Sequence, residues 1–349
     1  MPTMQQVADA AGVSIATVSR ALTTPQLVHE DTRKLIMAVV DRLGYAPNFA
    51  AKTLRTTRSQ KIIVTVPDIS NPFFSSVIRG VEEAAQEAGY AVLLGDTRDE
   101  PEREDQYGTM LRRKEADGII FLGRRIPNSV APLVRDKKSA APVVNACESS
   151  PELGVTSVHI DNLGAAYQAI NHIYDQGHQR VGIITGAPES PLNQDRMSGV
   201  LQGARERGLK HLLSVAIGDF SIGSGAKAAA DLLGSGDPPT AIFCFSDEMA
   251  MGTLAALRER GMRCPDQVSV VGFDDLRFSA FTDPPLTTIR QPAHEIGREA
   301  VKGLLGVLEG SVRRVKDIVL PHMWIARASL GPAPVPVVKP KRARAKVAR

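Results

Sequence analysis

The sequence predicts a mixed α/β protein, in which a small all-α helix-turn-helix headpiece precedes two doubly wound α/β lobes. Three patterns indicate this arrangement. The first 44 residues carry apolar side chains at helical spacing. From Ile62 onward, apolar runs of four to six residues alternate with helical stretches of about ten residues or more, which is the pattern of βαβ units. The alternation begins again after residue 161, so two lobes are expected.

The headpiece begins with two short helices between Thr3 and Leu22. Apolar residues recur at helical spacing on both sides of a break at residues 11–13, where Gly12 can adopt a positive φ. Thr3 and Ser14 are each placed to cap the helix that follows. Because so few residues join the helices, they must cross steeply, as in a helix-turn-helix. A two-helix corner of an ordinary globular domain remains the alternative at this point.

A third helix is expected from about Asp31 to Leu43, ended by Gly44. These helices complete a headpiece of residues 1–45, whose thin core should be only marginally stable alone. The inner stripe of the third helix would consist of Leu35, Val39 and Leu43, with Ile36 and Val40 beside them.

Residues 46–60 are expected to form a hinge helix and a linker. Pro47 can occupy a first helical turn, and Asn48 to Leu54 could make barely two turns. A helix this short does not persist alone in water, because nucleation is costly, so it needs DNA or a second copy of the chain as a partner. An ordinary interdomain linker is the alternative.

Each lobe is expected to combine segments that are distant in the sequence. The N-terminal lobe would comprise residues 61–161 with 291–320, and the C-terminal lobe residues 162–290 with 321–330. Residues 331–349 are Pro-rich and then basic, which predicts a disordered tail. That tail would either add salt-sensitive affinity for DNA or act as a solubilising extension.

Charge is unevenly distributed along the chain, although the net charge is only +4. Residues 1–60 carry seven Lys or Arg against four Asp or Glu, and the last eleven residues carry six basic side chains and no acid. The segment between them is therefore acidic. This pattern places any contact with a polyanion at the two ends of the chain.

Several classes of protein are excluded by what the sequence lacks. No apolar run is long enough to span a membrane, and the first residues lack the pattern of a signal peptide. Cys147, Cys244 and Cys264 show no spacing for a disulfide framework or a metal, which favours a cytoplasmic protein. GxGxxG, GxxxxGK[ST], GxSxG and HExxH are absent. We therefore expect no cofactor, no metal site, no catalytic residues and no enzymatic activity.

Polar side chains follow several of the predicted strands. In open α/β sheets, ligands bind beyond the carboxyl ends of the strands, so two facing lobes would enclose a cleft lined by such residues. Each residue could instead cap a helix, but together they suit a ligand that carries hydroxyl groups. They are Asp68, Asp161, Arg196, Ser246, Asp247, Asp274 and Asp275.

From Thr3 to Ala328 the sequence resembles the LacI/GalR (lactose-repressor-type) family of bacterial transcription regulators. The resemblance implies lobes of the periplasmic-binding-protein type and a homodimeric repressor that binds a palindromic double-stranded DNA operator. It also implies that a small-molecule effector in the cleft alters operator affinity, as inducer or as corepressor. A sugar-binding transport protein would share the lobes but not the headpiece. The matching segments are VADAAGVSIATVSRAL, LGYAPNFAAKTLRT, VPDISNPFFSSVIRGVEEAAQEAGY, DGIIFLG, GHQRVGIITG, FCFSDEMAMGTLAAL and SVVGFDD.

The resemblance also implies which residues contact DNA. Arg20 can pair bidentately with guanine, and the apolar Ile15 suits contact with a thymine methyl group. In the hinge, Leu54 occupies the position of a minor-groove wedge, and Arg55 adds positive charge beside it. His29 replaces the usual capping Ser of the third helix, so that helix is expected to begin less firmly. By position, Ile15, Ala16 and Arg20 would face bases, whereas Ser14, Thr17 and Ser19 would lie at or near the DNA backbone.

For the effector, the family's pocket positions correspond to Phe73, Phe74, Asp161, Arg196, Phe220 and Asp274, with Glu148 and Asn193 ranked lower. Phe74 and Phe220 could stack on a flat or sugar-like ring. Only Arg196 supplies definite positive charge at these positions, so a neutral ligand such as a nucleoside or a sugar is favoured over a phosphorylated one. The nearby Arg124 and Arg125 would weaken that argument if they reached the site. A sugar or polyol effector that controls carbohydrate catabolism is the alternative. The segments LLGD, VHIDN, YDQGH, DPPLTTI and EIGREA are nearest to a nucleoside-responsive member.

Overall fold

The computed structural model describes residues 2–46, 58–135, 141–148, 154–311 and 315–335 of the 349-residue chain. These residues form two compact units, which divide after Ser59, and each is described by itself. The expected hinge helix, with Leu54 and Arg55, lies outside the described residues, as does most of the predicted tail.

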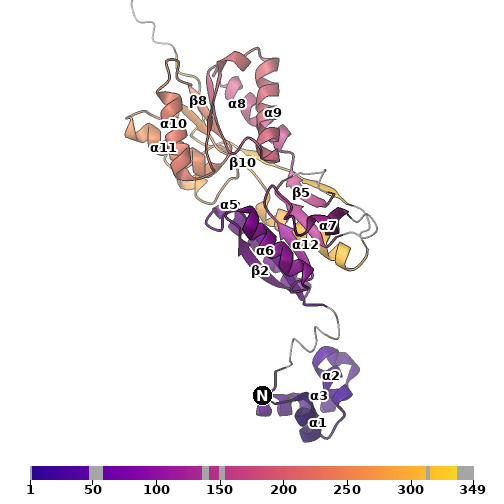
Figure 1. The fold of residues 1–349 in the computed structure, drawn as a ribbon. Coiled ribbons are helices and arrows are strands. Elements are labelled where there is room, and N and C mark those ends of the chain that lie inside the picture. Colours follow the sequence, from indigo (N-terminus) through magenta and orange to yellow (C-terminus); the bar gives the residue numbers. More distant parts are fainter. Residues whose placement is uncertain (1, 47–57, 136–140, 149–153, 312–314, 336–349) are drawn as a thin grey trace, which may run out of the picture. The chain divides into compact units, whose positions relative to one another are not determined.

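The first unit is the all-helical headpiece. It contains α1 (Met4–Ala11), α2 (Ile15–Thr23), the short 3₁₀ helix η1 (Pro25–Leu27) and α3 (Glu30–Leu43) (Figure 1). Thr3 and Gln6 form a capping box at the start of α1, and Gly12 ends that helix with a φ of 64°. The Ser14 side chain accepts a hydrogen bond from the backbone N–H of Thr17 at the start of α2. The predicted helix-turn-helix is therefore present.

The core of the headpiece differs from the prediction in one helix. The prediction for Leu35 was wrong, because this side chain is 50% exposed and α3 instead turns Ile36, Val39 and Val40 inward. Leu43 is half-buried and packs against the core. His29 occupies the N-cap position of α3 and makes no side-chain capping hydrogen bond. The buried residues are Val7, Ala8, Ala11, Val18, Ala21, Ile36, Val39, Val40 and Tyr45.

The second unit is two-lobed, and its first lobe is built on a six-stranded parallel sheet. Alternation along β1 directs Ile62 and Val64 to one face of this sheet and Ile63 to the other, so both faces are buried. Across the sheet, the strands follow the order β11 (Asp317–Leu320), β5 (Thr156–Ile160), β4 (Val143–Ala146), β3 (Gly118–Phe121), β1 (Lys61–Val66) and β2 (Ala91–Asp96).

Helices cover both faces of the first sheet. One face carries α5 (Pro72–Glu87) and α12 (Ala293–Leu308), which pack against each other although they are distant in the sequence (Figure 1). The other carries α6 (Pro101–Arg112) and the short α7 (Ala131–Arg135). Asn71 caps α5 by accepting a hydrogen bond from the backbone N–H of Phe73, and Pro72 occupies the first turn.

The second lobe is built on a four-stranded parallel sheet. Its strands follow the order β7 (Leu213–Ile217), β6 (Val181–Thr185), β8 (Ala241–Cys244) and β9 (Ser269–Val271). The helices α8 (Asn162–Asp175) and α9 (Pro191–Glu206) pair with each other, and so do α10 (Ile222–Leu233) and α11 (Asp247–Glu259), on opposite sides of β8 in Figure 1. Short 3₁₀ helices occur at Lys210–Leu212 (η3) and Ser279–Phe281 (η4).

Three segments connect the two sheets, between β5 and α8, between β10 and α12, and between β11 and β12. The strands β10 (Thr288–Arg290) and β12 (Met323–Ile325) pair antiparallel with each other. The predicted fold class, a helical headpiece followed by two α/β lobes with parallel sheets, is confirmed.

The helix pairs of both lobes approach closely at glycines. A Cβ at Gly297 of α12 would overlap the carbonyl oxygen of Val77 in α5, and a Cβ at Gly80 would overlap that of His294. Because these are backbone atoms of a buried crossing, they cannot move away as the end of a flexible side chain can.

Substitution Gly297→Ala should therefore destabilise the protein. Overpacking of a core costs about 1–3 kcal/mol, which should lower the midpoint of thermal unfolding by roughly 2–6 °C. Gly223→Ala is the matched control, because a Cβ there meets nothing within 4 Å and Ala favours the helix. Equal midpoints for the two variants would show that the crossing of α5 and α12 is not tightly packed.

Candidate functional site

The outward face of α2 is the first candidate site. Val18 and Ala21 of this helix are buried, whereas Ile15, Ala16 and Arg20 are exposed. Ser14 is also exposed, and Thr17 and Ser19 are half-buried. The six residues predicted to face DNA in the headpiece are thus on the side of α2 that the core leaves open.

Two of these residues are held by local hydrogen bonds. The hydroxyl oxygens of Ser14 and Thr17 lie 2.8 Å apart and share a hydrogen bond, and the Thr17 N–H donates to Ser14 Oγ over 3.1 Å. The guanidinium of Arg20 has no hydrogen bond or ion pair with any side chain in the part of the chain that the structure describes. A short, capped helix with one free guanidinium on its exposed face has the form of a helix that reads bases in a major groove.

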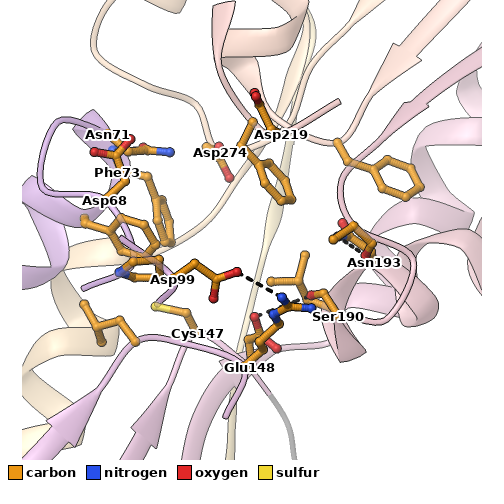
Figure 2. A pocket seen from close by; sticks show the side chains of 18 of the residues that line it. Asp68, Asn71, Phe73, Asp99, Cys147, Glu148, Ser190, Asn193, Asp219 and Asp274 are labelled. Carbon is orange, nitrogen blue, oxygen red and sulfur yellow. Dashed lines mark hydrogen bonds and ion pairs between the residues drawn. The ribbon is translucent and has the colours of Figure 1, made fainter. Parts of the chain in front are cut away.

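The second candidate site is a cavity of about 350 Å³ in the two-lobed unit. Loops at the carboxyl ends of strands in both lobes supply its walls, as expected for open α/β sheets. Figure 2 shows Asp68, Asn71 and Phe73 of the first lobe on one side of the cavity and Asn193 of the second lobe on the other.

Arg196 forms a buried part of the cavity wall and is 4% exposed. Its Nε donates to Asn162 Oδ1 over 2.9 Å, and Nη1 donates to the carbonyl oxygen of Phe245 over 2.5 Å. The guanidinium carbon lies 3.6 Å from the centre of the Phe273 ring. Burial lowers the pKa of Arg196 to about 10, against the opposing effect of nearby Asp274 and Glu148, so the side chain remains charged at neutral pH.

Asp274 enters the cavity from the loop after β9. Its backbone adopts a φ of 117°, and its Oδ1 accepts a hydrogen bond of 2.7 Å from Gln291 Nε2. Burial raises the pKa of Asp274, and the charge of Arg196 opposes that rise. The nearby carboxyl of Asp247 raises the pKa further, so the ionised form of Asp274 is disfavoured although Gln291 already donates to it.

Glu148 provides a buried carboxyl oxygen with no hydrogen-bond partner among the described residues. The side chain is 6% exposed, and its other oxygen, Oε1, lies 3.5 Å from Ser190 Oγ. Burial raises the pKa of Glu148 to about 7, although Arg196 and Arg124 oppose the rise. Asn193 Oδ1 is likewise buried without a partner in the described residues, while its Nδ2 donates to the carbonyl oxygen of Ala187. A ligand in the cavity could supply the missing donors.

The rim of the cavity carries an ion pair that joins the two lobes. Arg124, in the loop after β3, has Nη2 at 3.0 Å from Asp99 Oδ2 and Nη1 at 2.8 Å from Glu189 Oε1. Asp99 belongs to the first lobe and Glu189 to the second. Arg98, the remaining arginine of the lining, is paired with Asp96 at 3.5 Å.

Five of the six predicted effector residues line this cavity: Phe73, Phe74, Arg196, Phe220 and Asp274. Asp161 does not line it. Its carboxylate instead caps α8, where Oδ1 accepts a hydrogen bond of 2.8 Å from the N–H of Gly164. The rings of Phe73 and Phe74 lie edge to face, 5.5 Å apart.

The cavity also contains residues that the sequence analysis did not single out, among them Asn71, Asp99, Ser190, Asp219 and Gln291. Most of them follow a strand or begin a helix, so the strand-end rule applied to Asp68 could have identified them. Glu148 and Asn193, ranked lower from the sequence, both line the cavity.

The described residues contain neither a membrane-spanning helix nor a metal-binding cluster of side chains. None of their helices is long and apolar enough to cross a membrane. No group of three or more His, Cys, Asp or Glu side chains in that part of the chain is arranged to hold a metal ion.

Two segments of the chain match known protein families. Residues 3–48 match the lacI family of bacterial regulatory proteins, and residues 170–330 match the periplasmic binding protein-like domain. The chain is 42% identical over 309 residues to the HTH-type transcriptional repressor CytR of Escherichia coli (strain K12), which covers 88% of this chain and 90% of that protein.

Solved structures give the same result. The lac repressor dimer bound to operator and the anti-inducer ONPF matches with a TM-score of 0.84 and 25% identity, over 95% of this chain and 99% of that one. The complex of the transcriptional regulator CelR with cellobiose matches with a TM-score of 0.70 and 29% identity, over 94% and 100%. The chain belongs to the lacI family of bacterial regulatory proteins, and it is a ligand-responsive, DNA-binding transcriptional regulator, not an enzyme.

Proposed function

We propose that the protein is a homodimeric repressor that binds a palindromic operator and responds to a neutral, nucleoside-like effector. The observation that carries this proposal is the cavity at the strand ends of two lobes, in a chain that begins with a helix-turn-helix. Ser14, Ile15, Ala16, Thr17, Ser19 and Arg20 would form the operator contacts of the headpiece, with Leu54 and Arg55 of the hinge. Phe73, Phe74, Phe220, Arg196, Asp274, Glu148 and Asn193 would contact the effector.

Dimerisation is supported by apolar side chains that a single chain leaves open to solvent. Phe281 is 86% exposed in η4, and Ile222 and Phe278 are also exposed. A second copy could cover such side chains, which gain about 25 cal/mol for each Å² of apolar surface removed from water. Two headpieces in one dimer would match an operator with two half-sites.

The charges of the cavity support a neutral effector. Arg98, Arg124 and Arg196 line it, and each already has a partner within the protein. A phosphate group would therefore meet no free guanidinium in this lining, and it would lie near the carboxylates of Asp99 and Glu148. The unpartnered oxygens of Glu148 and Asn193 instead require hydrogen-bond donors, which amino and hydroxyl groups supply.

The aromatic side chains of the cavity are compatible with a nucleoside. Phe73, Phe74 and Phe220 give the cavity three rings, which suit the flat face of a base, while the carboxylates suit ribose hydroxyls. A sugar or polyol effector is the second candidate. The carboxylates of the cavity suit the hydroxyl groups of a sugar as well as those of ribose. One of the similar solved structures is the complex of CelR with cellobiose.

Substitution Arg20→Ala should weaken operator binding by about 10- to 100-fold, because a bidentate contact with guanine contributes roughly 1–3 kcal/mol. The operator is first selected from random duplexes by the unmodified protein, and affinities are measured at one fixed salt concentration. Arg42→Ala, on the exposed surface of α3, is the control and should bind normally. The selected site should be palindromic, and one half-site alone should bind far more weakly. A selected site without symmetry, or equal loss in both variants, would contradict the proposal.

Thermal unfolding against nucleosides, their 5′-monophosphates, nucleobases and common sugars tests the effector class. A nucleoside at about 100 times its Kd should stabilise the protein by about 2.7 kcal/mol, and the monophosphate should stabilise it less. Phe220→Ala should abolish the shift, and Asp161→Asn, outside the cavity, should retain it. A response to sugars alone would replace the nucleoside with the second candidate. No response to any compound would overturn this effector assignment.

Substitution Glu148→Gln should change how stability depends on pH. Because burial raises the folded-state pKa of Glu148 from 4.5 to about 7, the folded protein keeps a proton that the unfolded chain has lost. Stability therefore falls as pH rises through this window, and the neutral Gln does not contribute to that fall. Relative to the unmodified protein, the ligand-free variant should gain up to about 3 kcal/mol between pH 4.5 and 7 in urea titrations.

The control for this titration is Glu189→Gln. The hydrogen bond from Arg124 lowers the pKa of Glu189, which is the opposite direction to the shift of Glu148. Relative to the unmodified protein, Glu189→Gln should therefore not gain stability as pH rises from 4.5 to 7. Absence of a gain in Glu148→Gln as well would show that the carboxylate of Glu148 is not penalised by burial.

A further inference from the structure

Two consecutive aspartates leave β9 with their side chains in different environments. Asp274 and Asp275 have φ angles of 117° and 56°, a region that residues other than glycine rarely adopt. Asp274 lines the cavity and Asp275 does not. Such a backbone persists only where surrounding contacts hold it, and both residues have such contacts.

The Asp274 backbone and side chain are bonded to the segment that leaves the second lobe. Its N–H donates to the carbonyl oxygen of Ile289 over 2.7 Å, and its carbonyl oxygen accepts from the N–H of Gln291 over 3.3 Å. Gln291 Nε2 also donates to Asp274 Oδ1. Ile289 is in β10, and Gln291 lies two residues before the start of α12 in the first lobe. The cavity carboxylate is therefore bound to one of the three connections between the lobes.

Asp275 forms ion pairs with two of those connections. Its Oδ2 accepts from Arg290 Nε and its Oδ1 accepts from Arg327 Nη2, each over 2.6 Å, and the carboxylate is 7% exposed. Arg290 ends β10, and Arg327 follows β12, which returns from the first lobe. Arg327 is held in turn, because its Nη1 donates to the carbonyl oxygen of Leu286 and its N–H donates to Thr287 Oγ1.

We propose that Asp275 is a positioning residue that transmits effector binding at Asp274 to the relative position of the two lobes. Asp275 does not touch the effector. A peptide bond joins it to the cavity residue, and its two ion pairs join it to the strands on which the lobes move. A displacement of Asp274 by a bound effector therefore moves both connections together. The loop after β9 cannot take up this displacement by itself, because Asp275 is bonded to both connections. This inference rests on the proposed effector site.

The test is the coupling between effector and operator in full-length Asp275→Asn. Operator Kd is measured with and without the nucleoside that stabilises the unmodified protein most, starting with cytidine and adenosine. The unmodified protein should change its operator Kd by tenfold or more, within the range usual for allosteric coupling. The variant should change it by less than about twofold, while its effector Kd stays within about threefold.

Two further variants separate coupling from folding. Asp175→Asn breaks the 2.6 Å pair between Asp175 and Arg207, away from the connections, and should leave the coupling unchanged. Arg290→Gln removes one of the two ion pairs of Asp275. Because the Arg290 side chain is half-exposed, the variant should remain folded while the coupling is reduced. Undiminished coupling in both Asp275→Asn and Arg290→Gln would overturn the proposal, as would parallel loss of both affinities.

A ligand-free measurement keeps this test independent of the effector's identity. Spin labels on exposed positions of the two lobes give the distribution of interlobe distances, which should broaden in Asp275→Asn and not in Asp175→Asn. An unchanged distribution in Asp275→Asn would show that the ion pairs of Asp275 do not restrain the two connections, which would overturn the proposal. The distribution could broaden in Asp275→Asn although no nucleoside or sugar changes operator binding by the unmodified protein. That result would support the structural role of Asp275 and overturn the effector proposal.

Discussion

The buried guanidinium of Arg196 organises the cavity on which ligand response depends. It reaches from α9 to Asn162 at the start of α8, to the carbonyl oxygen of Phe245 after β8, and to the ring of Phe273 after β9. One side chain thus fixes the ends of several elements at the edge where their strands terminate. A buried cation requires such partners, because its desolvation is otherwise too costly. Its charge also opposes the rise in pKa that burial imposes on Glu148 and Asp274.

The arginines of the cavity and the arginine of α2 have different physical roles. In the cavity, every lining arginine is already bonded to an acid or a carbonyl group, so the lining is polar without being a phosphate site. On α2, Arg20 is exposed and unpartnered among the described residues. A free guanidinium pairs with base edges, whereas a paired one mainly orients its neighbours. The distribution of partners, more than the number of charges, separates the surface suited to DNA from the cavity suited to a neutral ligand.

Sequence reasoning was sound for the buried strands and for the residues that cap the headpiece helices. Runs such as residues 62–66 and 181–185 are buried strands, and the capping residues Thr3, Ser14 and Gly12 act at the ends expected of them. It failed where neighbouring positions compete for one face. On α3 the buried stripe runs through Ile36, Val39 and Val40, so Leu35 faces solvent. A rotation of the helix by one position is enough to cause this error, and spacing alone cannot detect it.

The sequence by itself determined the fold class, the helix-turn-helix and the strand ends from which cavity residues come, because these follow from local periodicity and capping chemistry. Only the tertiary structure decided which strand-end residues meet. Asp161 and Asp274 both follow a strand, yet Asp161 caps α8 while Asp274 enters the cavity. Glu148 acquires its unpartnered oxygen, and Asp275 its two arginines, from segments far away in the chain. Contacts between distant segments depend on how whole elements pack, and no local pattern records that packing.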